Sequence, residues 1–181
     1  PATVLLPANA EDVGKGLAFA HERGVPWFAV GLGSNLLFPD EGLDALVIRV
    51  GKGLDRIVQQ DTRWTIGAGL PGPLAARRTA QAGHAGLHKF VGVPGSVGGG
   101  VYMNAGCHGG EWSEVVKSVL VIDEAARDTW LSREEVPFTY RRSGLDGRIV
   151  VEVDVELPHA DKAELDEEIA SLFKWRQDGT P

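Results

Sequence analysis

The chain has 181 residues, of which 43% are hydrophobic and 24% charged, and its formal net charge is -7 at pH 7. This length suits one domain, or two small lobes that share an interface, and the composition is that of an ordinary globular protein. Its largest basic groups are the pairs Arg77–Arg78 and Arg141–Arg142. The sequence therefore lacks the basic surface that nucleic-acid binding requires.

Cysteine content and hydropathy exclude further classes. The single Cys107 excludes an internal disulfide and a thiolate metal site, and it fits a reducing, cytoplasmic compartment. No apolar run approaches the ~20 residues of a membrane span, and no signal peptide opens the chain. We expect no metal, no membrane and no nucleic acid, and we infer no protein partner. The chain starts in a strand-like run without Met and stops in a turn signal, which indicates a piece of a longer protein.

The first fifty residues predict a small α/β lobe. Apolar residues at helical spacing predict a helix over Ala10–Arg23, with Asn9 or Glu11 as its cap and Gly24 at its end. The first two predicted strands flank this helix in a βαβ arrangement. The predicted strands are Thr3–Leu6, Trp27–Val30 and Ala45–Val50.

The rest of the chain predicts a larger lobe whose strands pair mainly as hairpins. Helices are predicted over Pro71–Ala82 and Asp161–Trp175, and a capped helical turn over Ser132–Val136. The predicted strands are Asp55–Gln60, Arg63–Gly67, Val115–Asp123, Asp128–Leu131 and the cleanly alternating Arg148–Leu157. The predicted class is α+β and not a doubly wound sheet. We assign residues 1–52 to an N-terminal α/β lobe, 53–160 to a second α+β lobe, and 161–181 to a helix that leads to an absent C-terminal domain.

The stretch from Gly86 to Glu111 is unusually rich in glycine. Seven glycines lie between Pro94 and Gly110, and each glycine fixed in regular structure costs about 0.5–1 kcal/mol relative to alanine. We interpret this as backbone that a large, partly anionic ligand approaches closely, because such backbone exposes N–H donors. Interleaved valines indicate a buried segment, and Glu111 is a candidate to cap or brace it.

A second glycine-rich element, Gly31-Leu32-Gly33-Ser34-Asn35, directly follows a predicted strand. Its N–H groups, the Ser34 hydroxyl and the Asn35 amide suit phosphate oxygens. A Rossmann loop would need a third glycine at Leu36 and a helix beginning there, and a turn follows instead. Alone, the element is either a phosphate-binding loop or a structural turn. Two such elements together favour an extended ligand, such as a dinucleotide, between two lobes.

Four motifs stand in the order known from one enzyme family. They are Gly33-Ser34-Asn35-Leu36-Leu37, Gly92-Val93-Pro94-Gly95-Ser96-Val97-Gly98-Gly99, Met103-Asn104-Ala105-Gly106 and Tyr140-Arg141-x-Ser143. Over essentially all of its residues the chain resembles the FAD-binding part of the MurB family, the UDP-N-acetylenolpyruvoylglucosamine reductases of peptidoglycan synthesis. The resemblance implies a PCMH/vanillyl-alcohol-oxidase type of fold, in which two α+β lobes hold FAD non-covalently.

The resemblance also implies the reaction and the residues that serve it. NADPH would reduce FAD, which would reduce the substrate, UDP-N-acetylglucosamine enolpyruvate, to UDP-N-acetylmuramate. Arg141 would be the catalytic arginine, binding the enolpyruvyl carboxylate in two-point fashion, and Tyr140 would help to orient the substrate. Gly31, Gly33, Ser34 and Asn35 would contact the FAD pyrophosphate. The residues that would line the pyrophosphate, the ribityl chain and the flavin ring are Pro94, Gly95, Ser96, Gly98, Gly99, Asn104 and Gly106.

The sequence departs from the family pattern in three ways. Leu32 stands where the family often has glycine, no serine matches the proton-donor motif, and the distal glutamate would lie beyond Pro181. We therefore expect this piece to bind FAD without turnover. Two alternatives remain, a flavin module of another PCMH-type oxidase or dehydrogenase and a non-catalytic nucleotide-binding or structural domain. Cys107 and His108 raise the possibility of covalent flavin attachment, against which the family resemblance argues.

Overall fold

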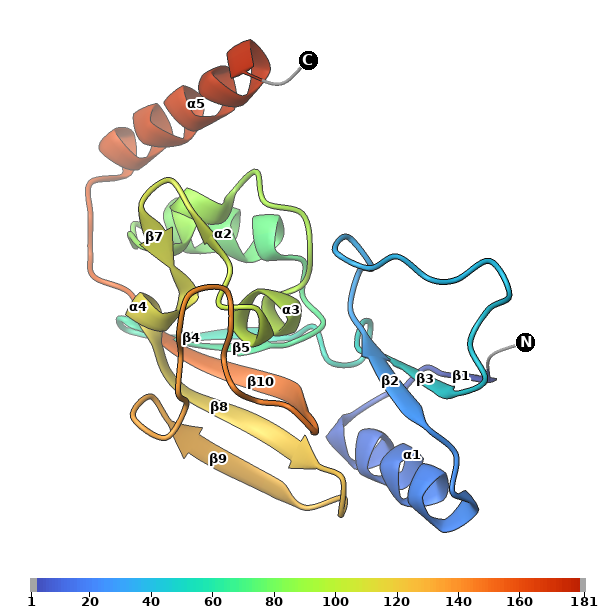
Figure 1. Ribbon diagram of the computed structural model, residues 1–181. Helices are drawn as coiled ribbons and strands as arrows, with labels where there is room; N and C mark the ends of the chain where they lie inside the picture. The colour runs from blue at the N-terminus through green and yellow to red at the C-terminus, as the bar shows by residue number, and fades with distance from the viewer. Residues whose placement is uncertain (1–2, 180–181) are drawn as a thin grey trace.

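The computed structural model describes residues 3–179 and shows two α+β units side by side (Figure 1). Residues 1–2 and 180–181, which the predicted boundaries include, lie outside the described residues. The first unit is a parallel sheet in the order β1-β3-β2, with one helix beside it. Its elements are β1 (Thr3–Leu5), α1 (Ala10–Arg23), β2 (Trp27–Val30) and β3 (Leu46–Arg49).

Helix α1 begins and ends where its capping residues predict. The Asn9 side chain accepts a hydrogen bond from the Asp12 backbone N–H at 3.0 Å, and Gly24 ends the helix in the left-handed conformation at φ 61°. Leu17 is buried with Ile48 of β3 in one core cluster. The βαβ prediction is confirmed in that β1 and β2 run parallel, although β3 lies between these two strands in the sheet.

The second unit is built on an antiparallel sheet in the order β4-β5-β10-β8-β9. Strand β10 is central because it pairs with strands on both sides, as Val153 does with Ile66 on one side and Val119 on the other. Alternate residues of the strand, Val153 among them, are buried. The five strands are β4 (Ile57–Gln60), β5 (Arg63–Gly67), β8 (Val116–Asp123), β9 (Asp128–Ser132) and β10 (Arg148–Glu156). This agrees with the hairpin-rich sheet predicted from the alternating pattern.

Short helices and a small hairpin cover this sheet (Figure 1). They are α2 (Gly72–Gln81), the 3-10 helix η1 (Leu87–Phe90), α3 (Val97–Tyr102), the hairpin β6 (Gly106–Cys107) and β7 (Gly110–Glu111), and α4 (Trp112–Val115). Helix α3 was not predicted, since three of its six residues are glycine. The predicted capped helical turn at Ser132–Val136 is confirmed as a single turn that does not continue as a helix. Ser132 ends β9, the Glu135 N–H donates to the Ser132 carbonyl at 3.1 Å, and the Ser132 N–H donates to Glu135 Oε2 at 2.8 Å.

The C-terminal helix α5 (Lys162–Gly179) packs beside α2 and η1. It begins one residue after its predicted start and continues past Trp175. Its buried Leu165 and a polar contact of 2.8 Å between His88 Nε2 and Glu168 Oε2 attach it to the second unit. Between residues 3 and 179, no helix is both long and apolar enough to cross a membrane, and no group of three or more His, Cys, Asp or Glu is placed to hold a metal.

Candidate functional site

A cavity of about 560 Å³ lies between the two units, within the roughly 300–1,000 Å³ of ligand pockets. The first unit contributes the loop after β2, residues 31–36, here called the Gly31 loop. The second unit contributes residues 93–106, here called the α3 segment, most of which line the cavity. Arg141, from the connection between β9 and β10, and the first residues of β10 complete the lining. The two glycine-rich elements singled out in the sequence therefore face one cavity.

The Gly31 loop is open at its tip and closed at its base. Gly33 has φ 74°, and a Cβ at this position would meet nothing within 4 Å. A Cβ at Gly31 would instead collide with the Ser96 hydroxyl of the α3 segment, and one at Gly95 would lie 3.2 Å from Ser34 Oγ. The two elements thus touch through glycines while leaving free space above Gly33.

The α3 segment is close-packed from behind. A Cβ at Gly98 would lie 2.7 Å from the Ala68 Cβ, and one at Gly100 would collide with the Trp112 indole. Ser96 caps α3, because its Oγ accepts the Gly99 N–H at 3.3 Å. Protein packing thus explains Gly98 and Gly100, so the sequence-based interpretation that a ligand alone requires these glycines is too broad.

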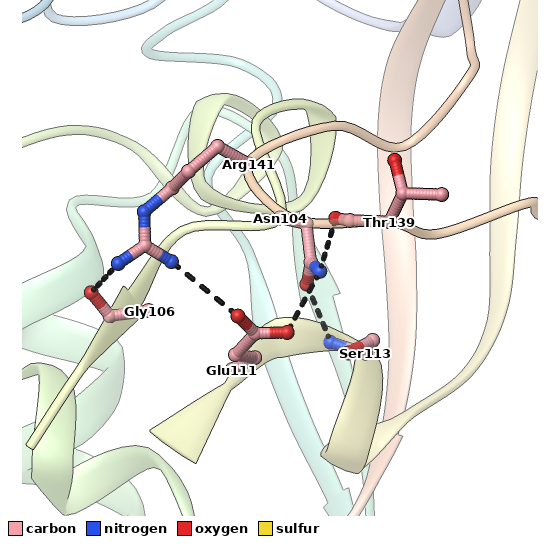
Figure 2. A network of polar contacts seen from close by, with 6 residues as sticks. All are labelled: Asn104, Gly106, Glu111, Ser113, Thr139 and Arg141. Atoms are coloured by element: carbon pink, nitrogen blue, oxygen red, sulfur yellow. Dashed lines mark hydrogen bonds and ion pairs between the residues drawn. The ribbon is translucent and has the colours of Figure 1, made fainter. Parts of the chain in front are cut away.

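Arg141 is held at the edge of the cavity by a strained turn (Figure 2). Thr139 and Arg142 exchange backbone hydrogen bonds of 2.8 and 3.2 Å, and Arg141 between them has φ 56°, a conformation that costs a non-glycine residue energy. Its Nη2 donates to the Gly106 carbonyl at 3.0 Å, and its guanidinium lies 4.8 Å from the centre of the Tyr140 ring. A Cβ at Gly106 would lie 2.5 Å from Arg141 Nη1, so this glycine makes room for the guanidinium.

The predicted site residues divide into those that line the cavity and those that do not. Asn104 is 1% exposed and lies behind the wall, and Tyr140 is 81% exposed and lies outside the lining. The predicted residues that the structure brings together on the cavity are Gly31, Gly33, Ser34, Asn35, Pro94, Gly95, Ser96, Gly98, Gly99, Gly106 and Arg141.

The cavity also has a lining that the motifs did not single out. Arg148, the first residue of β10, adds a second cation to the lining. In the sequence it stands at the start of an alternating strand and just after Gly147, which has φ 73°; a charged residue at a strand end is the signal that could have identified it. Burial raises the pKa of the lining phenol of Tyr102, and the neighbouring Asp146 raises it further. The other aromatic lining residues are Trp27, Phe28, Phe90 and Trp112.

Comparison with known proteins identifies the fold of the chain that forms this cavity. Residues 1–131 match the family described as "FAD binding domain". The chain belongs to this FAD-binding domain family. The match confirms the predicted PCMH-type fold and FAD as the cofactor of the family. A less similar structure shares the fold alone: the 6-hydroxy-D-nicotine oxidase of Arthrobacter nicotinovorans superposes with a TM-score of 0.67 and 21% identity, covering 86% of this chain and 36% of that chain.

Within the FAD-binding family, the chain is most informatively compared with UDP-N-acetylenolpyruvoylglucosamine reductases. It is 46% identical over 156 residues to that of Caulobacter vibrioides, covering 83% of this chain and 50% of the relative. It is 34% identical over 185 residues to that of Bacillus subtilis, covering 100% and 61%. The crystal structure of the Thermus caldophilus MurB superposes with a TM-score of 0.84 at 32% identity, covering 98% and 63%. The MurB resemblance is confirmed, and the chain spans about half to three-fifths of these proteins' lengths.

The residues present fit FAD. The open space above Gly33 is a cradle that any side chain would begin to fill, and glycine-rich backbone offers N–H donors to a pyrophosphate. Arg141 and Arg148 supply positive charge for an anionic ligand, and the aromatic residues supply apolar surface for ring systems. The cavity thus combines the polar and apolar surfaces that a dinucleotide requires.

Proposed function

We propose that this chain binds FAD non-covalently and is the FAD-binding part of a UDP-N-acetylenolpyruvoylglucosamine reductase. In that enzyme NADPH would be the reductant, and UDP-N-acetylglucosamine enolpyruvate would be reduced to UDP-N-acetylmuramate for peptidoglycan synthesis in the cytoplasm. The observation that carries the proposal is that two glycine-rich elements, far apart in sequence, face one cavity with Arg141 at its edge. The similarity to the reductases over nearly the whole chain supports the substrate.

The two units divide the work of holding FAD. Gly33, Ser34 and Asn35, with Gly31 at the base of the loop, would bind the pyrophosphate through backbone N–H groups and short polar side chains. The α3 segment would lie along the remainder of the cofactor through the residues that line the cavity, which are Pro94, Gly95, Ser96, Gly98, Gly99 and Gly106. In place of the direct contact predicted for Asn104, we propose that it acts from behind the wall. We retain residues 1–52, 53–160 and 161–181 as the proposed divisions of the chain.

Arg141 would bind and orient the enolpyruvyl carboxylate. FAD, when bound, supplies the hydride chemistry of the reaction. A guanidinium is planar and permanently charged, so it matches a carboxylate at two points and stabilises negative charge that develops there. Its fixed turn means that little reorganisation is needed when that charge appears. Tyr140, stacked against the guanidinium, would help to orient the substrate.

Purified protein incubated with FAD tests the first half of this proposal. We expect the flavin absorbance band to stay with the protein through gel filtration and NADPH to bleach it. A protein that stays colourless after incubation with FAD would contradict the proposal. We expect Arg141→Ala to retain FAD, because the arginine is assigned to the substrate; loss of FAD from this variant would contradict its role.

Arg141→Ala also tests the second half of the proposal, in a chain extended to the length of the relatives. There the variant should raise the activation free energy of substrate reduction by several kcal/mol, because transition-state stabilisation by the guanidinium is lost. Flavin reduction by NADPH should remain close to that of the unmodified protein. An equal slowing of both half-reactions would contradict the assignment of Arg141 to the substrate.

A further inference from the structure

Glu111 connects the α3 segment to the turn that carries Arg141 (Figure 2). It occupies the N-cap position of α4, but within the described chain its side chain makes no capping hydrogen bond. Its Oε2 instead accepts from Asn104 Nδ2 at 3.0 Å, and its Oε1 pairs with Arg141 Nη1 at 3.5 Å. One carboxylate therefore faces two donors that come from different parts of the fold.

The Asn104 side of this network is rigid. Asn104 is 1% exposed and has φ 41°. Its Nδ2 also donates to the Thr139 carbonyl at 2.9 Å, and its Oδ1 accepts the Ser113 N–H at 3.0 Å. Because Thr139 is the base of the Arg141 turn, Asn104 fixes the position of the turn while it fixes one oxygen of Glu111.

The Arg141 side is exposed and needs restraint. The Arg141 side chain is 41% exposed, and a free arginine side chain loses much rotamer entropy when it is ordered. Two tethers restrain it, Glu111 at Nη1 and the Gly106 carbonyl at Nη2. A guanidinium has five N–H donors, so these tethers leave donors for a ligand.

We propose that Glu111 is the positioning residue for Arg141. Its carboxylate transmits the fixed position of Asn104 to the guanidinium and holds it ready for two-point binding of a carboxylate. The competing interpretation is that Glu111 only braces the β6–β7 hairpin and Asn104, with no effect on the arginine. The inference rests on the proposed function in one respect only, that Arg141 binds the carboxylate of the substrate.

Glu111→Gln separates the two interpretations. A carboxylate accepts from two donors at once, whereas a carboxamide has one acceptor oxygen and one NH₂ donor. The shorter contact, to the buried Asn104, will take the oxygen and leave the NH₂ facing Arg141. The substitution therefore preserves the brace and removes the tether. Glu114→Gln, the same change at an exposed position of α4, is the matched control.

The experiment is nuclear magnetic resonance of the arginine guanidinium groups in this chain without FAD, with Arg141→Lys used to assign the Arg141 signals. We expect rotation of the Arg141 guanidinium about its Nε–Cζ bond to accelerate severalfold in Glu111→Gln and to stay unchanged in Glu114→Gln. Unchanged rotation in Glu111→Gln would overturn the proposal. If Glu111→Gln does not fold, the same measurement on Glu111→Asp, whose shorter side chain cannot span both contacts, decides with the same outcomes.

An FAD titration of the same variants distinguishes this inference from the proposed function. Failure of the unmodified chain to bind FAD would count against the proposed function, while the Arg141 measurement, made without FAD, would still judge Glu111. We expect Glu111→Gln to bind FAD as the unmodified chain does. Loss of FAD binding with an unchanged Arg141 signal would show a brace alone and overturn the proposal.

Discussion

A side chain placed at Gly33 would project into open space, whereas one placed at Gly98 would lie 2.7 Å from the Ala68 Cβ. Both glycines line the same cavity, yet they are needed for different reasons. Gly33 is required by its left-handed backbone at φ 74° and has open space above it, whereas Gly98 is required by the protein packed behind it. A glycine-rich sequence therefore marks close approach without saying whether a ligand or the protein itself approaches.

The largest expected effect is on the packed side of the comparison. In Gly98→Ala the new Cβ must displace Ala68, which is fully buried. We expect a loss of about 2–3 kcal/mol in the free energy of unfolding, because overpacking outweighs the gain in helix propensity. Urea denaturation of the FAD-free protein measures it.

Gly99→Ala is the control for this prediction. Gly99 is exposed, and its new Cβ would lie 3.4 Å from Ser96 Oγ. We expect unchanged or slightly raised stability, because alanine favours the helix. If both substitutions destabilised the protein equally, packing behind α3 would not be the cause.

The next effect tests whether the two glycine-rich elements are coupled. In Gly31→Ala the new Cβ would collide with the Ser96 hydroxyl, and we expect a loss of about 2 kcal/mol. Ser96→Ala alone removes the α3 cap and should cost about 1 kcal/mol. Since the second change also removes the colliding atom, the double variant should lose less than the sum. Additive losses in denaturation experiments would show that the two elements do not constrain each other.

A smaller loss is expected at the open side of the comparison. Gly33→Ala introduces no collision but forces a Cβ into the left-handed region, which costs about 1–2 kcal/mol. Its methyl group would enter the space assigned to FAD, so FAD affinity should fall by more than the stability does. Isothermal titration and thermal melting of the same sample compare the two quantities. A stability loss with FAD affinity intact would place the cofactor elsewhere.

The smallest expected effect is a pH dependence of the stability, and it arises at His84, which does not line the cavity. Burial lowers the pKa of His84 below its usual 6.5, and the neighbouring His159 lowers it further while Asp61 opposes this. The unfolded chain then binds the proton more readily, so the stability contributed by neutral His84 is present above about pH 6.5 and is lost as the pH falls. His84→Leu should flatten the fall in melting temperature between about pH 7 and 5. The exposed His21→Gln should leave it unchanged.

Local signals predicted most of the elements because they act within one stretch of chain. Asn9 and Gly24 specify both ends of α1 through their own backbone and side-chain chemistry. The alternation through Val151, Val153 and Val155 specifies the two faces of β10. Helix α3 escaped prediction because its glycines oppose a helix locally; the Ser96 cap and packing against Ala68 and Trp112 offset this in the folded chain.

The candidate site was predictable in part for the same reason. The motifs located both glycine-rich elements and Arg141, which line the cavity. They did not place Asn104, whose short polar side chain suits a ligand or a buried network equally well. Its three partners, Glu111, Thr139 and Ser113, come from segments whose proximity depends on the folded chain. Lining the cavity does not show what a residue binds, so the assignment of all these residues to FAD or substrate stays a prediction for experiment.

By itself the sequence determined where helix α1 starts and stops and which residues alternate between the faces of β10, because these depend on local sterics and periodicity. Only the tertiary structure decided which atoms approach each glycine, why three glycines form a helix in α3, and how Glu111 reaches both Asn104 and Arg141. These contacts join segments that are far apart in the chain, such as Asn104 and Thr139, which are 35 residues apart, and the still more distant Gly31 and Ser96. Close packing selects them, and no local propensity encodes them.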